Sequence, residues 1–222
     1  MRRPLRRVVR FVVLVAAGWY VACLAALLYV RAAQPPVTTL QLQRRAEALV
    51  RGQTYRLDRR PVDLDRLPPH VWQAVVAAED SRFFDHWGFD WIEIQEAREE
   101  MARGERRRGA STLTQQLVKN LFLTTHGSVV RKGLELTLTP PAELALPKRR
   151  ILELYINNIE WGPGIWGIEA AARHHYGIGA RQLSREQAAR LAAVIPAPLR
   201  RKPEAMGWYA EIILARMDAM NW

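Results

Sequence analysis

The sequence predicts a mainly α-helical protein in which a single membrane-spanning helix precedes one domain. Three observations predict this: an uncharged apolar run fills positions 11–30, later apolar residues recur three and four positions apart, and no alternating strand pattern of any length occurs. A chain of 222 residues has room for a membrane segment and one domain with a substantial core.

Residues 1–10 are predicted to form a basic cytoplasmic tail, and residues 11–30 a transmembrane anchor. At about 1.5 Å per residue the uncharged run is about 30 Å long, which matches a bilayer core. Five arginines lie within positions 1–10 and only Arg31 follows closely, so the positive-inside bias places the rest of the chain outside the cytoplasm. A cleaved signal peptide or a buried core helix is the alternative, but the run is long for the former and Arg31 disturbs the cleavage pattern.

Residues 31–66 are predicted to be a juxtamembrane connector and residues 67–222 the domain. The composition shifts to Gln, Arg, Pro and Thr after the apolar run, and Pro35 and Pro36 cannot prolong its helix. Positions 41–50 suit a short surface helix, whose basic side chains would lie well near anionic headgroups. A solvated helix face explains the same pattern equally well.

The net charge is strongly positive, with 33 Lys and Arg against 22 Asp and Glu, a formal +11. It favours a polyanionic partner such as nucleic acid, an anionic membrane surface or a phosphorylated substrate. The predicted topology argues against nucleic acid, because it puts the basic domain outside the cytoplasm. The one cysteine, Cys23, lies inside the apolar run, so an intramolecular disulfide and a cysteine-based metal cluster are excluded.

An ionisable pair, Glu79 and Asp80, ends the first helical stripe of the domain. Apolar residues precede Glu79 at the spacing i, i+3, i+4, i+7, namely Trp72, Val75 and Val76. Glu79 therefore falls on the buried face of a helix that begins after Pro68–Pro69. Burial raises the pKa of a carboxyl group toward the range of a general base or acid. Pairing with Arg82 or capping of the following turn is the alternative.

Two further helices are predicted between positions 91 and 122, joined by a basic loop at 106–109. Asp90 suits the N-cap of a helix over 91–103. In the next helix, Ser111, Gln115 and Lys119 would stack on one side, opposite a leucine stripe. Such a polar row suits sugar hydroxyls and phosphate oxygens near a helix N-terminus. An ordinary amphipathic surface helix is the alternative.

Arg131 and Glu135 stand four positions apart, as a modest surface ion pair would. The sharper interpretation sets Glu135 across a cleft from Glu79, because paired carboxylates divide acid, base and electrostatic roles at a glycosidic centre. Pro140 and Pro141 follow in the same helix, and they predict that it breaks or kinks there.

The rest of the chain is predicted to be helical at 147–158, 169–174, 184–194 and 204–220. Pro147 suits the start of the first of these helices, and a capping box opens the third at Ser184. His174 and His175 have no further ligand at helical spacing, which disfavours a metal there.

Four ordered blocks resemble the signature motifs of the bacterial peptidoglycan glycosyltransferases, glycosyltransferase family 51, in their monofunctional biosynthetic form. The blocks are 77–88, 109–120, 131–135 and 148–171, and the resemblance runs from about Asp63 to Pro198. It implies a lysozyme-like helical domain with a hydrophobic jaw near the membrane through which the lipid substrate enters.

The resemblance implies a transferase that polymerises lipid II into peptidoglycan strands. Glu79 would be the general base, removing the proton from the 4-hydroxyl of the acceptor's N-acetylglucosamine. That oxygen attacks C1 of the N-acetylmuramic acid on the lipid-linked donor, undecaprenyl pyrophosphate leaves, and the anomeric centre inverts. Glu135 would assist at the donor pyrophosphate. No tightly bound cofactor is expected, with Mg²⁺ or Mn²⁺ as the candidate cation.

The same resemblance implies a set of substrate-binding residues, with Lys119 as the pyrophosphate contact. They are Asp80, Phe83, His86 and Gly88 in the first motif, Ser111, Thr112, Gln115, Gln116, Lys119 and Asn120 in the second, and Arg131 and Lys132 in the third.

The implied setting is the bacterial cytoplasmic membrane, crossed once, with the N-terminus in the cytoplasm and the catalytic domain outside. The expected partners are lipid II, the growing lipid-linked glycan chain and the membrane, with transpeptidases and cell-division proteins as candidates and no nucleic acid. The implied role is cell-wall biogenesis and the maintenance of cell shape.

Two departures from the family pattern keep alternatives open. Pro140 and Pro141 stand where relatives usually continue a helix with apolar residues, and Gly127 stands where many relatives place an arginine. A non-catalytic lipid II-binding component of the wall machinery would tolerate these changes. A membrane-anchored lysozyme-like hydrolase is the other alternative: it would share the fold and a catalytic Glu but would not need the basic second and third motifs.

Overall fold

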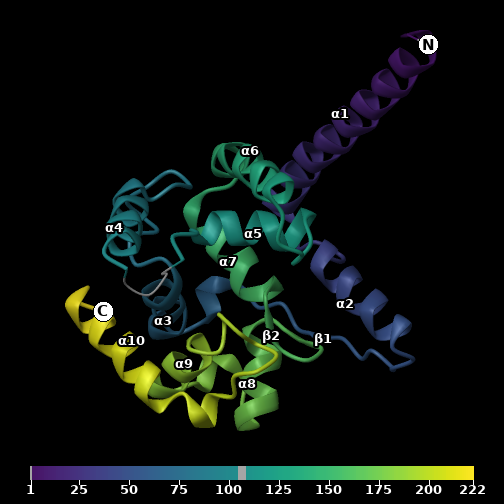
Figure 1. Cartoon of the computed structure of the whole chain (residues 1–222). Helices are drawn as coiled ribbons and strands as arrows, with labels where there is room; N and C mark the ends of the chain where they lie inside the picture. Colours follow the sequence, from purple (N-terminus) through teal and green to yellow (C-terminus); the bar gives the residue numbers. More distant parts are fainter. Residues whose placement is uncertain (1, 105–108) are drawn as a thin grey trace.

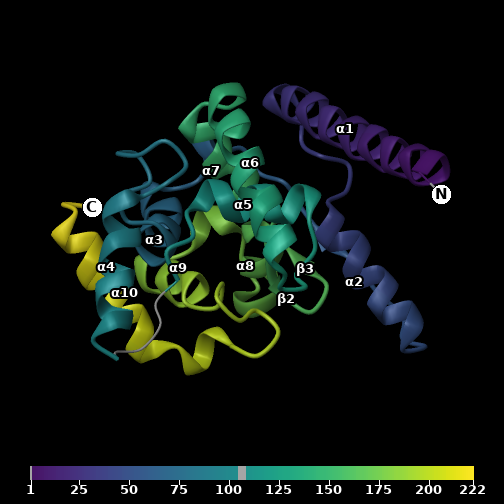
Figure 2. The same cartoon turned by 45° about the horizontal axis from the view of Figure 1, so that its top comes forward.

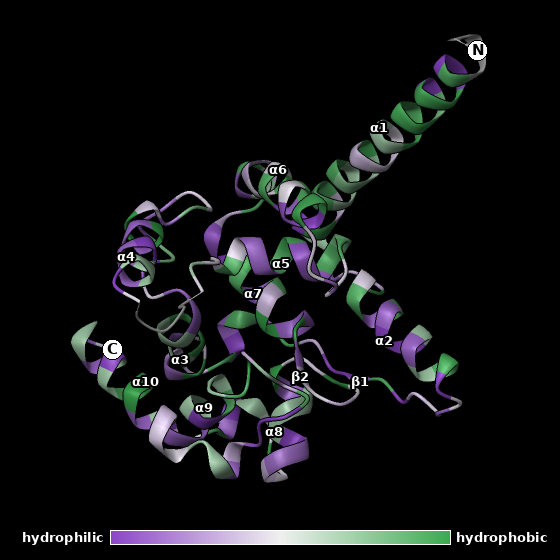
Figure 3. Ribbon diagram, in the orientation of Figure 1, coloured by the Kyte–Doolittle hydropathy of each residue, from purple (hydrophilic) through white to green (hydrophobic). Residues whose placement is uncertain are grey.

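The computed structural model describes residues 2–104 and 109–222, so most of the basic loop predicted at 106–109 lies outside the described residues. Helix α1 (Arg2–Ala32) leaves the rest of the molecule as a single rod (Figure 1). It is apolar along most of its length (Figure 3), and its segment Leu5–Ala32 is long and apolar enough to cross a membrane. Residues 2–10 of the predicted tail and the whole predicted anchor thus form one continuous helix.

The C-terminal half of α1 packs against the domain. Cys23, Leu27 and Val30 are buried, with Trp19, Tyr20 and Leu24 partly buried beside them. Helix α6 (Val129–Ala145) provides the facing surface (Figure 1). The anchor is therefore part of the hydrophobic core at one end and a free rod at the other.

The connector holds helix α2 (Thr39–Val50), strand β1 (Asp58–Arg59) and a 3₁₀ turn, η1 (Leu64–Arg66). The predicted helix at 41–50 is confirmed, and it starts two residues earlier because Thr38 forms a capping box with Gln41. The end of α2 near Thr39 is fixed to the domain, where the Thr39 hydroxyl donates to the Leu121 carbonyl at 2.8 Å. Its other end points away from the body (Figure 2).

The body is mainly helical, as predicted. Its first half consists of α3 (Pro69–Glu79), α4 (Trp91–Ala102), α5 (Leu113–Phe122), α6 and α7 (Lys148–Asn158). Helix α5 lies at the centre and packs on α6 and α7 (Figure 1). Its predicted leucine stripe is buried, with Leu113 and Leu117 fully inaccessible to solvent. One detail was wrong: Thr112 caps α5, so Ser111 stands before the helix and does not stack with Gln115 and Lys119.

The second half is α8 (Ile168–Tyr176), η2 (Ala180–Gln182), α9 (Arg185–Ala192), η3 (Pro203–Ala205) and α10 (Gly207–Ala219). The capping box predicted at Ser184 is confirmed. Helix α9 packs on both α3 and α10. Helix α10 also packs directly on α3, and its Arg216 reaches the Ala77 carbonyl near Glu79. Chain segments more than a hundred residues apart thereby meet beside the predicted base.

A small sheet was not predicted. Strands β2 (Glu160–Gly162) and β3 (Ile165–Trp166) form an antiparallel pair, and β1 joins β3 in parallel to give the order β1-β3-β2. Strands of two or three residues are too short to show alternation. The turn between β2 and β3 needs glycine at Gly164, which has φ +76° and where a Cβ would stand 2.3 Å from the Arg56 carbonyl oxygen.

Helix α6 does not break at Pro140 and Pro141, one of the two outcomes predicted there. Helix α6 includes both prolines in its 17 residues. The side chains of Thr137 and Thr139 donate to helix carbonyls within α6, at 3.0 Å to Leu134 and 2.7 Å to Glu135. These bonds do not replace the two that the prolines remove, because the amides missing at Pro140 and Pro141 would have bonded the Leu136 and Thr137 carbonyls.

Candidate active site

A cavity of about 630 Å³ opens beside the C-terminal end of α3. Five of the predicted site residues line it: Glu79, Asp80, Ser111, Thr112 and Gln116. Arg201, Tyr209 and Arg216, from the C-terminal part of the chain, also line it. The cavity therefore lies between the first two motifs and a helix that no motif identified.

Glu79 is the last residue of α3, and its side chain is partly exposed toward the cavity. Its Oε2 accepts a hydrogen bond from Gln116 Nε2 at 2.8 Å, and Gln116 Oε1 accepts one from the Tyr155 hydroxyl at 2.8 Å. Burial raises the pKa of Glu79, and the nearby Asp80 charge raises it further. The Gln116 hydrogen bond and the charges of Lys119 and Arg201 oppose this. A held carboxylate with a raised pKa suits a general base.

Tyr155 orients the Gln116 amide group that holds Glu79. Its side chain is fully buried, and burial holds the pKa of its hydroxyl well above the ordinary value, so the group remains a donor. With Gln116 Oε1 bound to Tyr155, the amide must present its NH₂ group to Glu79. Tyr155 lies in the helix predicted at 147–158, and no part in the site was predicted for it.

We expect Tyr155→Phe to lower the polymerisation rate by up to about tenfold, because one orienting hydrogen bond of about 1 kcal/mol is lost. The pH at which the rate falls to half on the acid side should also shift, since Gln116 is then free to turn its oxygen toward Glu79. Rates measured across pH test this. Tyr176→Phe is the matched control, because its hydroxyl has no hydrogen bond among the described residues and it does not line the cavity. An unchanged pH profile in Tyr155→Phe would contradict the orienting role.

Glu135 lies on α6 within a second group of charged side chains. It is 3% exposed, its Oε2 accepts from Arg131 Nη1 at 2.8 Å, and its Oε1 pairs with Lys132 Nζ. Lys132 also donates to Ser111 Oγ at 3.2 Å, which connects the group to the cavity wall. Burial lowers the pKa of Lys119, and Glu135 and Glu79 both act against that shift. Lys119 is thus electrostatically coupled to both predicted carboxylates.

Glu135 does not fit a divalent cation in this arrangement. Cationic side chains already occupy both of its carboxylate oxygens. A metal ion would have to displace Arg131 or Lys132 and would meet repulsion from the displaced charge.

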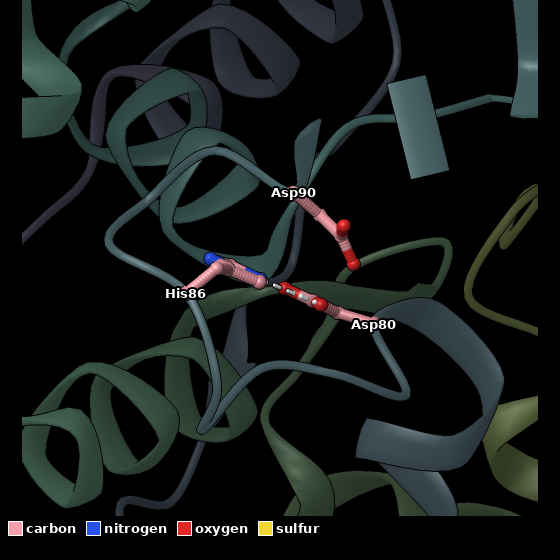
Figure 4. A group of neighbouring side chains, drawn as sticks. All are labelled: Asp80, His86 and Asp90. Atoms are coloured by element: carbon pink, nitrogen blue, oxygen red, sulfur yellow. Dashed lines mark hydrogen bonds and ion pairs between the residues drawn. The ribbon is translucent and has the colours of Figure 1, made fainter. Parts of the chain in front are cut away.

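Asp80, His86 and Asp90 form a buried cluster whose potential ligand atoms lie within 4.8 Å of one another (Figure 4). His86 Nε2 donates to Asp80 Oδ1 at 2.9 Å, and Asp80 Oδ2 accepts from the Leu113 amide at 2.9 Å. Asp90 caps α4 by accepting from the Ile92 and Glu93 amides, as predicted. Protein N–H groups therefore already use these oxygens, and the cluster ties together the ends of α3, α4 and α5.

The other predicted residues support the site and do not line the cavity. Phe83 is fully buried beneath the Lys148 ammonium, which lies 4.4 Å from the ring centroid. Gly88 has φ +75°, and a Cβ there would come within 2.5 Å of the Thr139 side chain on α6. Gln115 closes the capping box of α5 with Thr112, and Asn120 is buried. Gly88 thus allows the loop after α3 to lie against α6, and Gln115 fixes the start of α5.

The sequence did not identify the cavity residues of α10 and of the segment before it, because they belong to none of the four motifs. Arg216 Nη1 donates to the Ala77 carbonyl at 3.1 Å, near the C-terminus of α3 where a cation is favourable. Arg201 lies 5.4 Å from the Tyr209 ring centroid and acts on Glu79 electrostatically. In a chain with many surface arginines, only the fold distinguishes these two.

Comparison with known proteins gives a consistent result. A family model described as transglycosylase matches residues 46–219. A biosynthetic peptidoglycan transglycosylase of Pseudomonas fluorescens (strain SBW25) is 47% identical over 181 residues, which cover 81% of this chain and 75% of that protein. Proteins of the same name are 51% identical in Ectopseudomonas mendocina (strain ymp), covering 75% of this chain and 69% of the relative, and 45% identical in Pseudomonas entomophila (strain L48), covering 88% and 81%.

Proposed function

Because the chain belongs to the transglycosylase family, a family of enzymes that polymerise peptidoglycan glycan strands, we propose that Glu79 is the general base of that reaction. The observation that carries the proposal is the position of Glu79: it faces the cavity, is held by Gln116 and has a raised pKa. A base needs this combination of a fixed carboxylate, access to the substrate and a pKa raised toward the working pH.

The proposed reaction transfers the glycan from a lipid-linked donor to the 4-hydroxyl of an acceptor sugar. Glu79 takes the hydroxyl proton as the oxygen attacks C1 of the donor from the face opposite the leaving group. The bond from C1 to the pyrophosphate oxygen breaks with its electron pair on that oxygen, so the anomeric centre inverts. In this proposal lipid II is the precursor and undecaprenyl pyrophosphate the leaving group.

Arg131, Lys132 and Lys119 are proposed to receive the leaving pyrophosphate. Fixed donors and charges stabilise a developing anion without reorganising during the step. Glu135 holds Arg131 and Lys132 in place through two ion pairs, and Ser111 connects this group to the cavity that Glu79 faces. The proposed role of Glu135 is therefore to order the cationic side chains, and no step is routed through a metal ion.

The membrane helix supports a lipid-linked substrate. From Leu5 to Gly18, before the helix meets the domain, α1 is about 21 Å long, which is shorter than a bilayer core of about 30 Å. The rest of the bilayer would then lie beside α6, whose Leu136 and Leu144 side chains are exposed. The basic N-terminal end would stay in the cytoplasm, with the site on the other face of the membrane.

The test is polymerisation of purified lipid-linked disaccharide-pentapeptide by the detergent-solubilised full chain. We expect labelled precursor to become long glycan strands on a gel. The same preparation, incubated with finished cell wall, should release no fragments. Fragment release without strand growth would contradict the transferase and indicate a hydrolase, whereas binding of precursor with no product would indicate a non-catalytic component.

A further inference from the structure

Two consecutive prolines leave helix α6 without two of its backbone donors. In an α-helix the amide of each residue bonds the carbonyl four positions earlier, and proline has no amide hydrogen. Pro141 therefore removes the helix donor for the Thr137 carbonyl, yet α6 continues to Ala145. A backbone carbonyl without a donor is costly, above all at a depth where a bilayer excludes water.

The missing donor is supplied by the membrane helix. The Tyr20 hydroxyl of α1 donates to the Thr137 carbonyl oxygen at 3.0 Å, across 117 positions of sequence. About one turn farther along both helices, Leu24, Leu27 and Leu28 of α1 and Pro141, Leu144 and Ala145 of α6 line a small groove. Tyr20 itself is partly buried against the core.

This contact lies between two functional parts of α6. Glu135 is six residues before Pro141, and Glu143 is two residues after it. Glu143 accepts from the Thr114 hydroxyl at 2.6 Å and from Lys148 at 2.8 Å, so this half of α6 is fastened to α5 and α7. A shift of α6 at the prolines would therefore change the position of Glu135 relative to Ser111 and Lys119.

We propose that Tyr20 is a positioning residue whose hydroxyl replaces the hydrogen bond that Pro141 removes and thereby holds α6 in register with the site. The membrane helix is then a working part of the catalytic domain as well as an anchor. The effect on rate rests on the proposed role of Glu135, whereas the replacement of the backbone bond does not.

A double-mutant cycle tests the proposal, because Pro141→Ala restores the amide that Tyr20 replaces. In the full chain in detergent, Tyr20→Phe should lower the polymerisation rate about threefold to tenfold and speed amide hydrogen exchange in residues 142–146 by a similar factor. With Pro141→Ala also present, Tyr20→Phe should change either quantity by less than about twofold. Tyr29→Phe is the matched control, since Tyr29 is an exposed tyrosine of the same helix.

Each outcome decides one point. Equal effects of Tyr20→Phe on exchange in the two backgrounds, or no effect in either, would overturn the proposal, because the hydroxyl would not be standing in for the Pro141 amide. If Pro141→Ala abolishes the effect of Tyr20→Phe on exchange but the rate is unchanged throughout, the result would support the Tyr20 hydroxyl as the replacement for the Pro141 amide. The role proposed for Glu135 would then be wrong. A slower rate and faster exchange, both rescued by Pro141→Ala, support the whole proposal.

Discussion

Glu79→Gln is expected to lower the rate of glycan polymerisation by about 10²–10⁴-fold, the contribution typical of a general base. Glutamine keeps the size of the side chain and an oxygen that accepts from Gln116, so the wall of the cavity should keep its shape. Only the capacity to take a proton is removed. The measurement is the initial rate of strand growth from labelled lipid-linked precursor at saturating concentration.

The pH dependence of the wild type gives the same residue a second signature. The base must be deprotonated, so the rate should fall as pH decreases through the raised pKa of Glu79, above the ordinary value of a glutamate. That pKa also affects stability. Because the folded state holds the proton more tightly, Glu79 contributes stability below its unfolded pKa that is lost as pH rises through the folded pKa. At neutral pH, Glu79→Gln should therefore be at least as stable as the wild type.

Glu186→Gln is the matched control. Glu186 is an exposed glutamate of α9 that pairs with Arg190, and it does not line the cavity. It should polymerise at the wild-type rate. A Glu79→Gln enzyme that works within tenfold of the wild type would show that another group accepts the proton. Thermal unfolding of each variant separates loss of chemistry from loss of fold.

Glu135→Gln is expected to lower the rate by about 10²-fold, the usual cost of disturbing a preorganised electrostatic site. The amide cannot hold Arg131 and Lys132 by charge, and the two cations, with Lys119 nearby, would then repel one another. Because the cluster is proposed to act on the leaving group, the rate at saturating precursor should fall more than the apparent affinity.

Charge and side-chain size can be separated at the same position. Glu135→Asp keeps the negative charge but shortens the side chain, so it should recover part of the rate lost in Glu135→Gln. A Glu135→Gln enzyme with normal rate and weaker precursor binding would contradict the proposed role in ordering the leaving-group site. The measurement is rate against precursor concentration for both variants and for Glu186→Gln.

Much of the fold was available from local sequence. The anchor, the helix starts at Pro69, Asp90 and Ser184, and the buried stripe of α5 all depend on residues one to four positions apart. At α6 the same rules allowed a break that the structure does not show, and the contact that satisfies the Thr137 carbonyl comes from Tyr20, 117 positions away. The short sheet was missed for a related reason, since its strands depend on pairing and not on their own pattern.

The candidate site was also predicted only in part from the sequence. The motifs identified Glu79, Gln116 and Glu135 as residue types suited to the chemistry, and the structure places Glu79 and Gln116 in direct contact. It gives Phe83, Gly88 and Gln115 supporting positions, which a motif cannot separate from residues that face the substrate.

By itself the sequence determined the helical class, the long apolar N-terminal helix and the family, because periodicity, capping and ordered motifs are written in neighbouring residues. Only the tertiary structure decided which polar groups meet at the cavity. The hydrogen-bond chain from Tyr155 through Gln116 to Glu79, the arginines of the C-terminal segment and the seating of α1 on α6 each join segments that are distant in sequence. Such contacts are fixed by the packing of whole helices. Because the packing energy is distributed over many core contacts, it produces no pattern among neighbouring residues of the sequence.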